Sequence, residues 1–357
     1  MELLPSTYKR LMLISPGEED VEDAKIEVRE TTMPGSLKMD EVLIKVAAAP
    51  VNPSDYGAWV RPASGEWKPK AIGNEGAGTV VRVGSNIACA VAGVKVGSKV
   101  GFTGLRSDQG SYGEYVVAPL STTFVMDDSL PVEDAASFFV NPFTAVGILD
   151  TVASKHSSAR AFVHTAAASQ LGQMLVKLVT EVELINVVRS EKQAELLREL
   201  GAKHVVIVED ANDDADPGLP KLRELVDALG ATVAFDAVAG AMTGKLVTFL
   251  PPKSTVYVYG RLDGDIKGVA PIDLIYRGKK LAGWYLRSYL TGDGVLATAR
   301  RMSVAAAKVR AGLGRGGWCA STFADCTMAT FWTTFLDIRN STGFTDRKLR
   351  IRFAPEG

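Results

Sequence analysis

The segment VHTAAASQLGQM, residues 163–174, begins like the end of a buried strand and continues like the start of a helix. An apolar run, then small residues, then apolar residues at helical spacing predict a strand, a turn and a helix in that order. Nucleotide-binding turns of this form usually contain several glycines. This turn keeps one glycine, Gly172, and the positions before it hold Ala167, Ala168, Ser169, Gln170 and Leu171.

The same rhythm continues from residue 160 to about 285. Strand-like runs RAFVHT, ELINVV, HVVIV, TVAFDAV and STVYVYG alternate with the helical runs SQLGQMLVKLVTE, EKQAELLRELG, LPKLRELVDALG and AMTGKLVTFL. This alternation predicts an α/β fold with a parallel, doubly wound sheet of five strands.

The rest of the chain has a different pattern. Before about residue 140, short β-branched runs such as EVLIKVAAAPVN and GEYVVAP are separated by Gly, Pro, Asn and Ser, which predicts a mostly β domain. The last part, from LRSYLTGDG to KLRIRF, holds one helical stretch and a late β-like run. We expect it to return to the first domain, because it is too short to form a domain of its own.

Composition and charge favour a small-molecule ligand. A chain of 357 residues suggests about two domains. Its formal net charge of −1 gives no electrostatic reason to expect nucleic acid or an anionic membrane as partner. Cys89, Cys319 and Cys326 are too few and too scattered for a disulfide framework, so we expect a reducing, cytoplasmic setting. The first residues contain no long apolar run, which argues against a secretory signal or a membrane span.

The one-glycine turn is compatible with a bound pyrophosphate. In dinucleotide-binding folds, backbone N–H groups and the positive end of the helix dipole bind the phosphates, and glycine is needed only where a Cβ would collide. Residues 167–172 replace two glycines of the G-x-G-x-x-G pattern by small residues and keep the third, and the Ser169 hydroxyl can donate to a phosphate. A strand–turn–helix with no ligand is the alternative.

A basic residue follows the second expected strand. In NADH-binding folds an acidic residue there, about 20 residues past the turn, binds the ribose 2′-hydroxyl. In the segment LINVVRSEKQ this place holds Arg189 and Ser190. A guanidinium pairs with a 2′-phosphate, which a carboxylate would repel. The segment therefore favours NADPH, and a solvated arginine at a helix start is the alternative.

Several segments in fixed order resemble a known family. They are AAAPVNPSDY, IGNEGAGTVVRVGS, VNPFTAVGILD, INVVRSEKQAELLRELGAKHVV and LAGWYL, between about residues 40 and 290. In these the chain resembles the zinc-independent medium-chain dehydrogenases/reductases, in the quinone oxidoreductase and enoyl thioester reductase group. The NPSD, GNEG, VNP-x-TA and NVVR segments are similar to those of mitochondrial-type 2-enoyl thioester reductases.

The resemblance implies an architecture and a set of site residues. It implies a GroES-like substrate domain over residues 1–139 and 287–357, a Rossmann NADPH domain over residues 140–286, a cleft between them, and a homodimer. By motif match, Asn52 of NPSD and Asn141 of VNPFTA are expected near the nicotinamide. Further residues expected on the cofactor side are Thr144, Tyr259, Gly260, Arg261, Trp284, Leu286 and Lys348. The two asparagines could instead serve turns before proline, and Trp284 could be core.

The sequence predicts no metal site. Zinc-dependent relatives need a soft or imidazole ligand after the turn that corresponds to NPSD and a histidine before the glutamate of GNEG. This chain has Asn52-Pro53-Ser54-Asp55 and Gly73-Asn74-Glu75-Gly76, so neither ligand is present. Its three histidines, His156, His164 and His204, all lie in the alternating half, and we interpret them as structural.

One departure from the family bears on the reaction. Enoyl thioester reductases of this type have a proton-donating tyrosine several residues beyond NPSD, but the stretch GAWVRPASGEWKPKA contains none. Tyr56 is the nearest phenol, and we treat it with Asn52 as a candidate catalytic residue.

A quinone acceptor needs no positioned acid, because its reduced form takes protons from water. The sequence therefore favours metal-free hydride transfer from NADPH to a quinone or small enone. Reduction of enoyl thioesters is the second reading, and NADPH binding with little catalysis is the third. Loops 61–70 and 105–111 are expected to shape the acceptor pocket.

Overall fold

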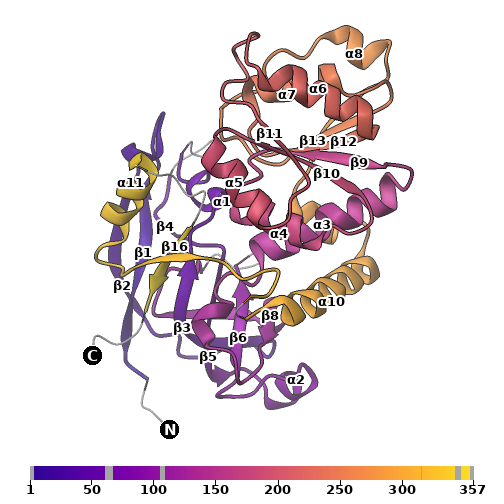
Figure 1. Ribbon diagram of the computed structural model, residues 1–357. Coiled ribbons are helices and arrows are strands. Elements are labelled where there is room, and N and C mark those ends of the chain that lie inside the picture. Colours follow the sequence, from indigo (N-terminus) through magenta and orange to yellow (C-terminus); the bar gives the residue numbers. More distant parts are fainter. Residues whose placement is uncertain (1–3, 61–66, 105–108, 315, 342–346, 354–357) are drawn as a thin grey trace. The chain divides into compact units, whose positions relative to one another are not determined.

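The computed structural model describes residues 4–60, 67–104, 109–314, 316–341 and 347–353 (Figure 1). The chain divides into two compact units, Met1–Pro142 with Ala306–Gly357, and Phe143–Ala305. They are called the first and the second unit below. Of the loops expected to shape the acceptor pocket, residues 61–66 and 105–108 lie outside the described residues.

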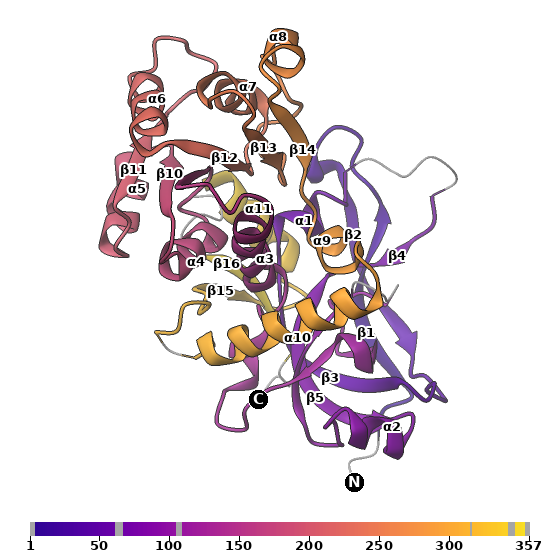
Figure 2. The same ribbon diagram turned by 90° about the vertical axis from the view of Figure 1, so that its right-hand side faces the viewer.

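The second unit is built on six parallel strands in the order β11-β10-β9-β12-β13-β14, which run from left to right in Figure 2. The strands are β9 (Ala161–His164), β10 (Glu183–Val188), β11 (His204–Ile207), β12 (Ala231–Asp236), β13 (Thr255–Val258) and β14 (Lys280–Gly283). The helices along this part of the chain are α3 (Val140–Lys155), α4 (Gln170–Leu178), α5 (Glu191–Glu199), α6 (Gly218–Leu229), α7 (Gly240–Phe249), α8 (Pro271–Ile275), α9 (Leu286–Thr291) and α10 (Val295–Gly312). The prediction of a parallel, doubly wound sheet is confirmed.

Helices cover both faces of this sheet. Alternate strand residues such as Val163, Ile185 and Val256 share one core with α6 and α7. On the opposite face, Ala168 and Val188 pack with α5. Figure 1 shows α6 and α7 on one side of the strands and α4 and α5 on the other. The strand order changes direction between β9 and β12, and such a switch point is where doubly wound sheets bind ligands.

The sequence analysis missed the sixth strand. β14 has four residues, of which the last three begin the LAGWYL segment, and it pairs in parallel with β13. Its residues Lys280–Gly283 are half-buried or exposed, so they lack the apolar run that marks the other strands.

The first unit consists mainly of two sheets. The smaller has the order β2-β1-β4, with β1 (Thr7–Ser15), β2 (Lys25–Thr32) and β4 (Lys70–Ala71). The larger has the order β15-β16-β3-β5-β6-β8, and β7 also pairs with β3. Its strands are β3 (Glu41–Pro50), β5 (Glu75–Val83), β6 (Lys99–Thr103), β7 (Tyr115–Pro119), β8 (Thr123–Val125), β15 (Phe323–Cys326) and β16 (Lys348–Arg352). The helices α1 (Pro53–Tyr56), α2 (Asn86–Val91) and α11 (Phe331–Ser341) complete it, with three short 3-10 segments at Val21–Asp23, Leu120–Thr122 and Val132–Ala135.

The end of the chain is more structured than expected. The single helical stretch predicted there corresponds to α9, α10 and α11, and a second strand, β15, precedes β16. β16 pairs antiparallel with β3. The rings of Trp59, Phe331 and Phe335 pack together in one core. Among the helices that the structure describes, none combines the length and the apolar character that a membrane span needs.

Candidate active site

The turn between β9 and α4 is closed by its own polar groups. The Ser169 hydroxyl caps α4 by accepting a hydrogen bond from the Gly172 N–H at 3.2 Å. The same hydroxyl keeps its proton for a further acceptor. A Cβ on Gly172 would lie 2.0 Å from the carbonyl oxygen of Ala167, so the one glycine of the pattern stands where a side chain cannot fit.

A buried carboxylate joins this turn to the next strand. Asp236, the last residue of β12, accepts hydrogen bonds from the Thr165 hydroxyl at 2.6 Å and the Thr243 hydroxyl at 2.5 Å. The Val238 N–H donates to the same carboxylate at 2.9 Å, and the Ala237 N–H donates to Thr165 at 2.9 Å. Burial raises the pKa of Asp236, against these hydrogen bonds. The strand ends on both sides of the switch point are thereby fixed to each other.

Arg189 is exposed and directly follows β10. Its backbone N–H donates to the Gln193 side chain at 3.1 Å, and the next residue, Ser190, caps α5. Its side chain is exposed, and no carboxylate among the described residues pairs with its guanidinium. The structure therefore leaves this cation available at the carboxyl edge of the sheet.

The residues after β13 reach the same edge. The Tyr259 hydroxyl lies 2.6 Å from Nε2 of His164, and the two rings stack at 5.9 Å. Burial lowers the pKa of His164 to about 3, so its ring is neutral, and its Nδ1 is buried without a partner. Gly260 packs so closely on Ala237 that a Cβ would lie 2.5 Å from the carbonyl oxygen there. Arg261 is exposed and pairs with Asp265 at 3.6 Å.

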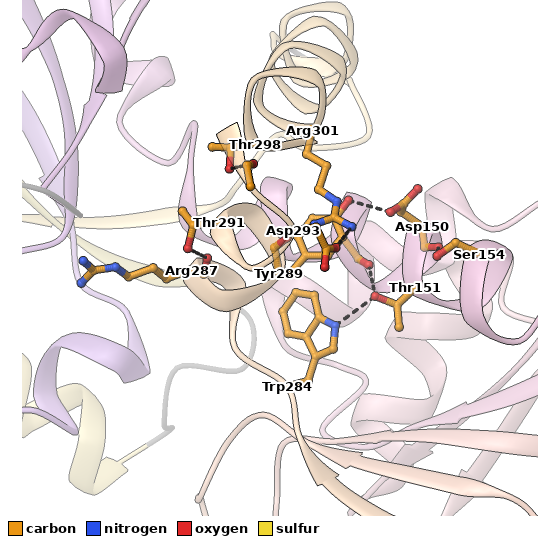
Figure 3. A network of polar contacts seen from close by, with 12 residues as sticks. Asp150, Thr151, Ser154, Trp284, Arg287, Tyr289, Thr291, Asp293, Thr298 and Arg301 are labelled. Carbon is orange, nitrogen blue, oxygen red and sulfur yellow. Dashed lines mark hydrogen bonds and ion pairs between the residues drawn. The ribbon is translucent and has the colours of Figure 1, made fainter. Parts of the chain in front are cut away.

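The segment after β14 belongs to a polar network, shown in Figure 3. The indole N–H of Trp284 donates to the Thr151 hydroxyl at 3.0 Å, and its ring stacks on Tyr289 at 5.7 Å. The Tyr289 hydroxyl donates to Asp150 at 2.9 Å. Trp284 is therefore a core residue that attaches the segment to α3, and Leu286 beside it is also buried.

The first unit buries a second polar cluster. Glu75 accepts hydrogen bonds from the Asn52 side chain at 2.9 Å and from the N–H groups of Phe139 and Val140 at 2.8 and 2.9 Å. The Lys348 ammonium lies 3.6 Å from the same carboxylate and donates to Ser137 at 3.2 Å. Two residues predicted as separate site members, Asn52 and Lys348, thus meet on one buried glutamate.

Two acceptor atoms next to this cluster have no hydrogen-bond partner among the described residues. The Asp55 carboxyl accepts from the Asn52 N–H at 2.7 Å through one oxygen, and its other oxygen is buried without a partner. The side-chain oxygen of Asn52 is also buried and unpaired. Burial raises the pKa of Asp55 to about 7, against the hydrogen bond from Asn52, and the charge of Glu75 adds to the rise.

Tyr56 lies on the same short helix but in an apolar setting. Its ring contacts Phe335 at 5.6 Å and Trp59 at 6.5 Å, and it is half-buried. Burial raises the pKa of its hydroxyl to about 12, although the charge of Arg339 opposes the rise. A phenol with so high a pKa is a weak proton donor near neutral pH.

The two remaining candidates lie in the first turns of α3. Asn141 follows Val140, whose N–H donates to Glu75, and it is half-buried. Thr144 is buried one turn further on. Among the described residues no group of three His, Cys, Asp or Glu side chains could hold a metal ion. The amide of Asn74, at the place where zinc enzymes carry histidine, donates to Ser54 at 3.4 Å.

Sequence reasoning missed the partners that hold these residues. The sequence analysis assigned no role at the site to Glu75, Thr165, His164 or Asp236. The usable signal was their position, because each of the last three ends or directly follows a strand of a parallel sheet.

Parts of the chain are similar to known proteins. The model of the alcohol dehydrogenase GroES-like domain matches residues 38–128. A mitochondrial enoyl-[acyl-carrier-protein] reductase of Arabidopsis thaliana is 29% identical over 72% of this chain and 68% of its own length. A protein of Leishmania amazonensis named as a probable quinone oxidoreductase is 26% identical over 80% of this chain and 83% of its own.

A crystal structure from Mesorhizobium loti, assigned as an NADPH:quinone reductase, superposes with a TM-score of 0.82. It is 28% identical and covers 98% of this chain and 100% of its own. The resemblance to zinc-independent medium-chain reductases is confirmed. So is the predicted fold class, a GroES-like domain with a parallel α/β sheet.

The pKa of Asp55 predicts a pH dependence of stability. The folded chain keeps this proton to about pH 7, whereas an ordinary aspartate releases it near pH 3.8. Below about pH 4 both states are protonated and the group has no effect. As pH rises to 7 the unfolded state is progressively favoured, and above pH 7 the loss is complete.

Asp55→Asn keeps the acceptor for Asn52 and lacks the titration. Between pH 5 and pH 8 we expect the wild type to lose on the order of 2 kcal/mol of unfolding free energy relative to this variant. Urea unfolding of both proteins at the two pH values measures the difference. An equal difference at both pH values would show that Asp55 is ionised in the folded chain at pH 5.

Proposed function

We propose that this chain is an NADPH-dependent reductase that transfers hydride to a quinone or a small α,β-unsaturated carbonyl without a metal ion. The observation that carries this proposal is the fixed, one-glycine turn at the switch point of the sheet, with the unpaired guanidinium of Arg189 at the end of the neighbouring strand. The names of the relatives agree in enzyme class, and that of the Mesorhizobium loti structure also gives NADPH as the cofactor. On both points the expectations from the sequence are borne out.

The residues present fit this cofactor. The start of α4 and the Ser169 hydroxyl are suited to hold the pyrophosphate, and Arg189 to hold the 2′-phosphate. Tyr259 and Gly260 lie at the same carboxyl edge of the sheet. Gly260 is suited to this place because its backbone lies against Ala237, where a side chain would not fit. NADPH supplies the hydride when bound, and the chain's task is to orient it and the acceptor.

On the first unit, Asn52 and Lys348 are the proposed contacts to the reacting groups. The unpaired side-chain oxygen of Asn52 can accept from an amide or hydroxyl, and Glu75 fixes its orientation. The buried ammonium of Lys348 is suited to stabilise negative charge that develops on the acceptor oxygen. Burial lowers the pKa of Lys348, although the charge of Glu75 opposes this.

The setting of Tyr56 favours a quinone over an enoyl thioester. Enone and enoyl thioester reduction require a proton on carbon, whereas hydride transfer to a quinone gives a hydroquinone monoanion, whose phenolate oxygen takes one proton from water. The hydroxyl of Tyr56, with its pKa near 12, is poorly matched to acid catalysis at neutral pH. Enoyl thioester reduction stays the second candidate, favoured by the similarity to the Arabidopsis protein.

Binding of NADPH without turnover is the remaining alternative. Stopped-flow mixing of the NADPH-loaded protein with a panel of quinones and enones separates it from the enzymatic readings. We expect oxidation of the bound NADPH by at least one quinone. Tight binding with no oxidation by any acceptor would favour the binding protein.

Arg189 should determine the preference for NADPH. Loss of one charge-assisted contact costs about 1.5–3 kcal/mol, or roughly ten- to a hundredfold in affinity. We expect Arg189→Ala to lose this factor for NADPH and to leave NADH binding unchanged, in fluorescence titrations. Arg223→Ala, an exposed arginine on α6, is the matched control. Equal wild-type affinities for NADPH and NADH would contradict the proposed role.

Tyr56→Phe separates the two enzymatic readings. If the phenol donates a proton, its loss should slow enone or enoyl thioester reduction by the ~10²- to 10⁴-fold typical of general acids. We expect the quinone rate to change less than about threefold. Steady-state assays of one preparation with both acceptors, in the presence of EDTA, measure this. An equal, large loss with both acceptors would mean that Tyr56 positions a substrate.

The same assays test the metal-free reaction, because we expect activity to persist in EDTA. Loss of all activity with EDTA, restored by zinc, would contradict the metal-free reaction.

We also propose a homodimer in the cytoplasm. Ile272 and Ile275 on α8 are 53% and 69% exposed, Tyr276 directly after it is 82% exposed, and β14 is the last strand of its sheet. An apolar surface beside an open strand edge is suited to pairing with a second copy. Light scattering after size exclusion should give a dimer for the wild type and for Val295→Asp, and a monomer for Ile275→Asp. A monomeric wild type would refute the dimer.

The proposal of a cytoplasmic location rests on the three buried free thiols, which support a reducing compartment. Cell fractionation tests it.

A further inference from the structure

Arg287 is an exposed cation of the second unit that pairs with no described carboxylate. Four arginines of this unit pair with carboxylates: Arg198 with Glu191, Arg261 with Asp265, Arg277 with Asp273 and Arg301 with Asp293. Arg287 shares with Arg189 the lack of such a pair among the described residues. No carboxylate or carbonyl of the described residues pairs with the guanidinium of Arg287. Two positions before it, the Tyr285 phenol is 58% exposed.

The backbone that carries these two side chains is held firmly. Arg301 donates to the carbonyl oxygen of Tyr289 at 2.5 Å and lies over its ring at 4.7 Å. Trp284 is tied to α3, and the carbonyl oxygen of Arg287 accepts from the Thr291 hydroxyl at 2.9 Å. Figure 3 shows the Arg287 side chain extending away from this network. A rigid support lowers the entropic cost of a contact made by the side chain.

The position of Arg287 differs from that of Arg189 in what it can reach. Both lie just beyond the carboxyl ends of strands, Arg189 after β10 and Arg287 after β14. Four strand spacings separate β10 from β14 in the sheet order, or about 19 Å at the usual spacing of about 4.8 Å. A dinucleotide with its 2′-phosphate at Arg189 crosses the switch point, so its nicotinamide lies toward β13 and β14. Arg287 is therefore on the side where the acceptor must meet the nicotinamide.

We propose that Arg287, with the exposed phenol of Tyr285 two positions before it, binds an anionic group on the acceptor. The inference rests on the proposed function and adds a substrate class to it: acceptors that carry a sulfonate, carboxylate or phosphate. The planar guanidinium fork matches such oxyanions bidentately, and the phenol can donate a further hydrogen bond. The contact is remote from the reacting atoms, so it lowers KM for these acceptors with little effect on kcat.

Two quinones that differ by one charge test this proposal. We compare 1,4-naphthoquinone with its 2-sulfonate in wild type, Arg287→Ala, Arg287→Lys and the control Arg300→Ala, an exposed arginine on α10. We expect Arg287→Ala to lower kcat/KM for the sulfonate ten- to a hundredfold through KM, since that is the effect of one charge-assisted contact. The neutral quinone should change less than about threefold. Arg287→Lys should recover part of the loss, and Arg300→Ala should match the wild type.

A binding measurement keeps the proposal separate from the proposed function. Calorimetric titration of the NADP⁺-loaded protein with redox-inert 2-naphthalenesulfonate should show at least tenfold tighter binding to the wild type than to Arg287→Ala, whether or not quinones are reduced. Equal binding to both proteins would overturn the anion site, as would an equal loss of activity with both quinones. A wild type that binds the sulfonate but reduces neither quinone would uphold the anion site and refute quinone reduction.

Discussion

The buried carboxylate of Asp236 joins the ends of β9 and β12 where the sheet changes direction, and the geometry of the cofactor edge depends on it. Its bonds to Thr165, Thr243 and the Val238 N–H fix both loops. Within these loops Ala166 and Ala239 adopt positive φ values of 49° and 63°, a conformation usually left to glycine. Such strain of about 1–3 kcal/mol persists only where surrounding contacts impose it. A turn with one glycine can therefore keep a fixed shape, in which we propose that it binds a pyrophosphate.

In the first unit a buried glutamate, Glu75, fixes the candidate site residues. The amide of Asn52 donates to the buried carboxylate of Glu75, and the buried ammonium of Lys348 lies near the same carboxylate. Glu75 is fully buried yet satisfied by two N–H groups, the Asn52 amide and the nearby charge of Lys348. Burying a charge is tolerated when it is paired and hydrogen-bonded in this way. Glu75 thereby holds Asn52 and Lys348 close to each other, and the proposed reaction uses no metal ion.

Local patterns made much of the fold predictable, and distant contacts decided the rest. The parallel sheet follows from the alternation of apolar runs, and the helix start at Ser169 from a capping residue before apolar spacing. Glu75 and Lys348 are far apart in the sequence, as are His164 and Tyr259, so no periodicity could pair them. The pKa of Tyr56 could not be foreseen either, because Phe335 of α11 contributes to the apolar surroundings of its ring. β14 was missed because its four residues are not buried enough to produce an apolar run.

Hydrogen–deuterium exchange with and without saturating NADPH tests the central claim most directly. If the one-glycine turn and the end of β10 hold the cofactor, NADPH should slow exchange in peptides that cover residues 165–172 and 188–194. Peptides from α6, on the far face of the sheet, should change little. The account would be contradicted if NADPH bound tightly but left exchange at 165–172 unchanged.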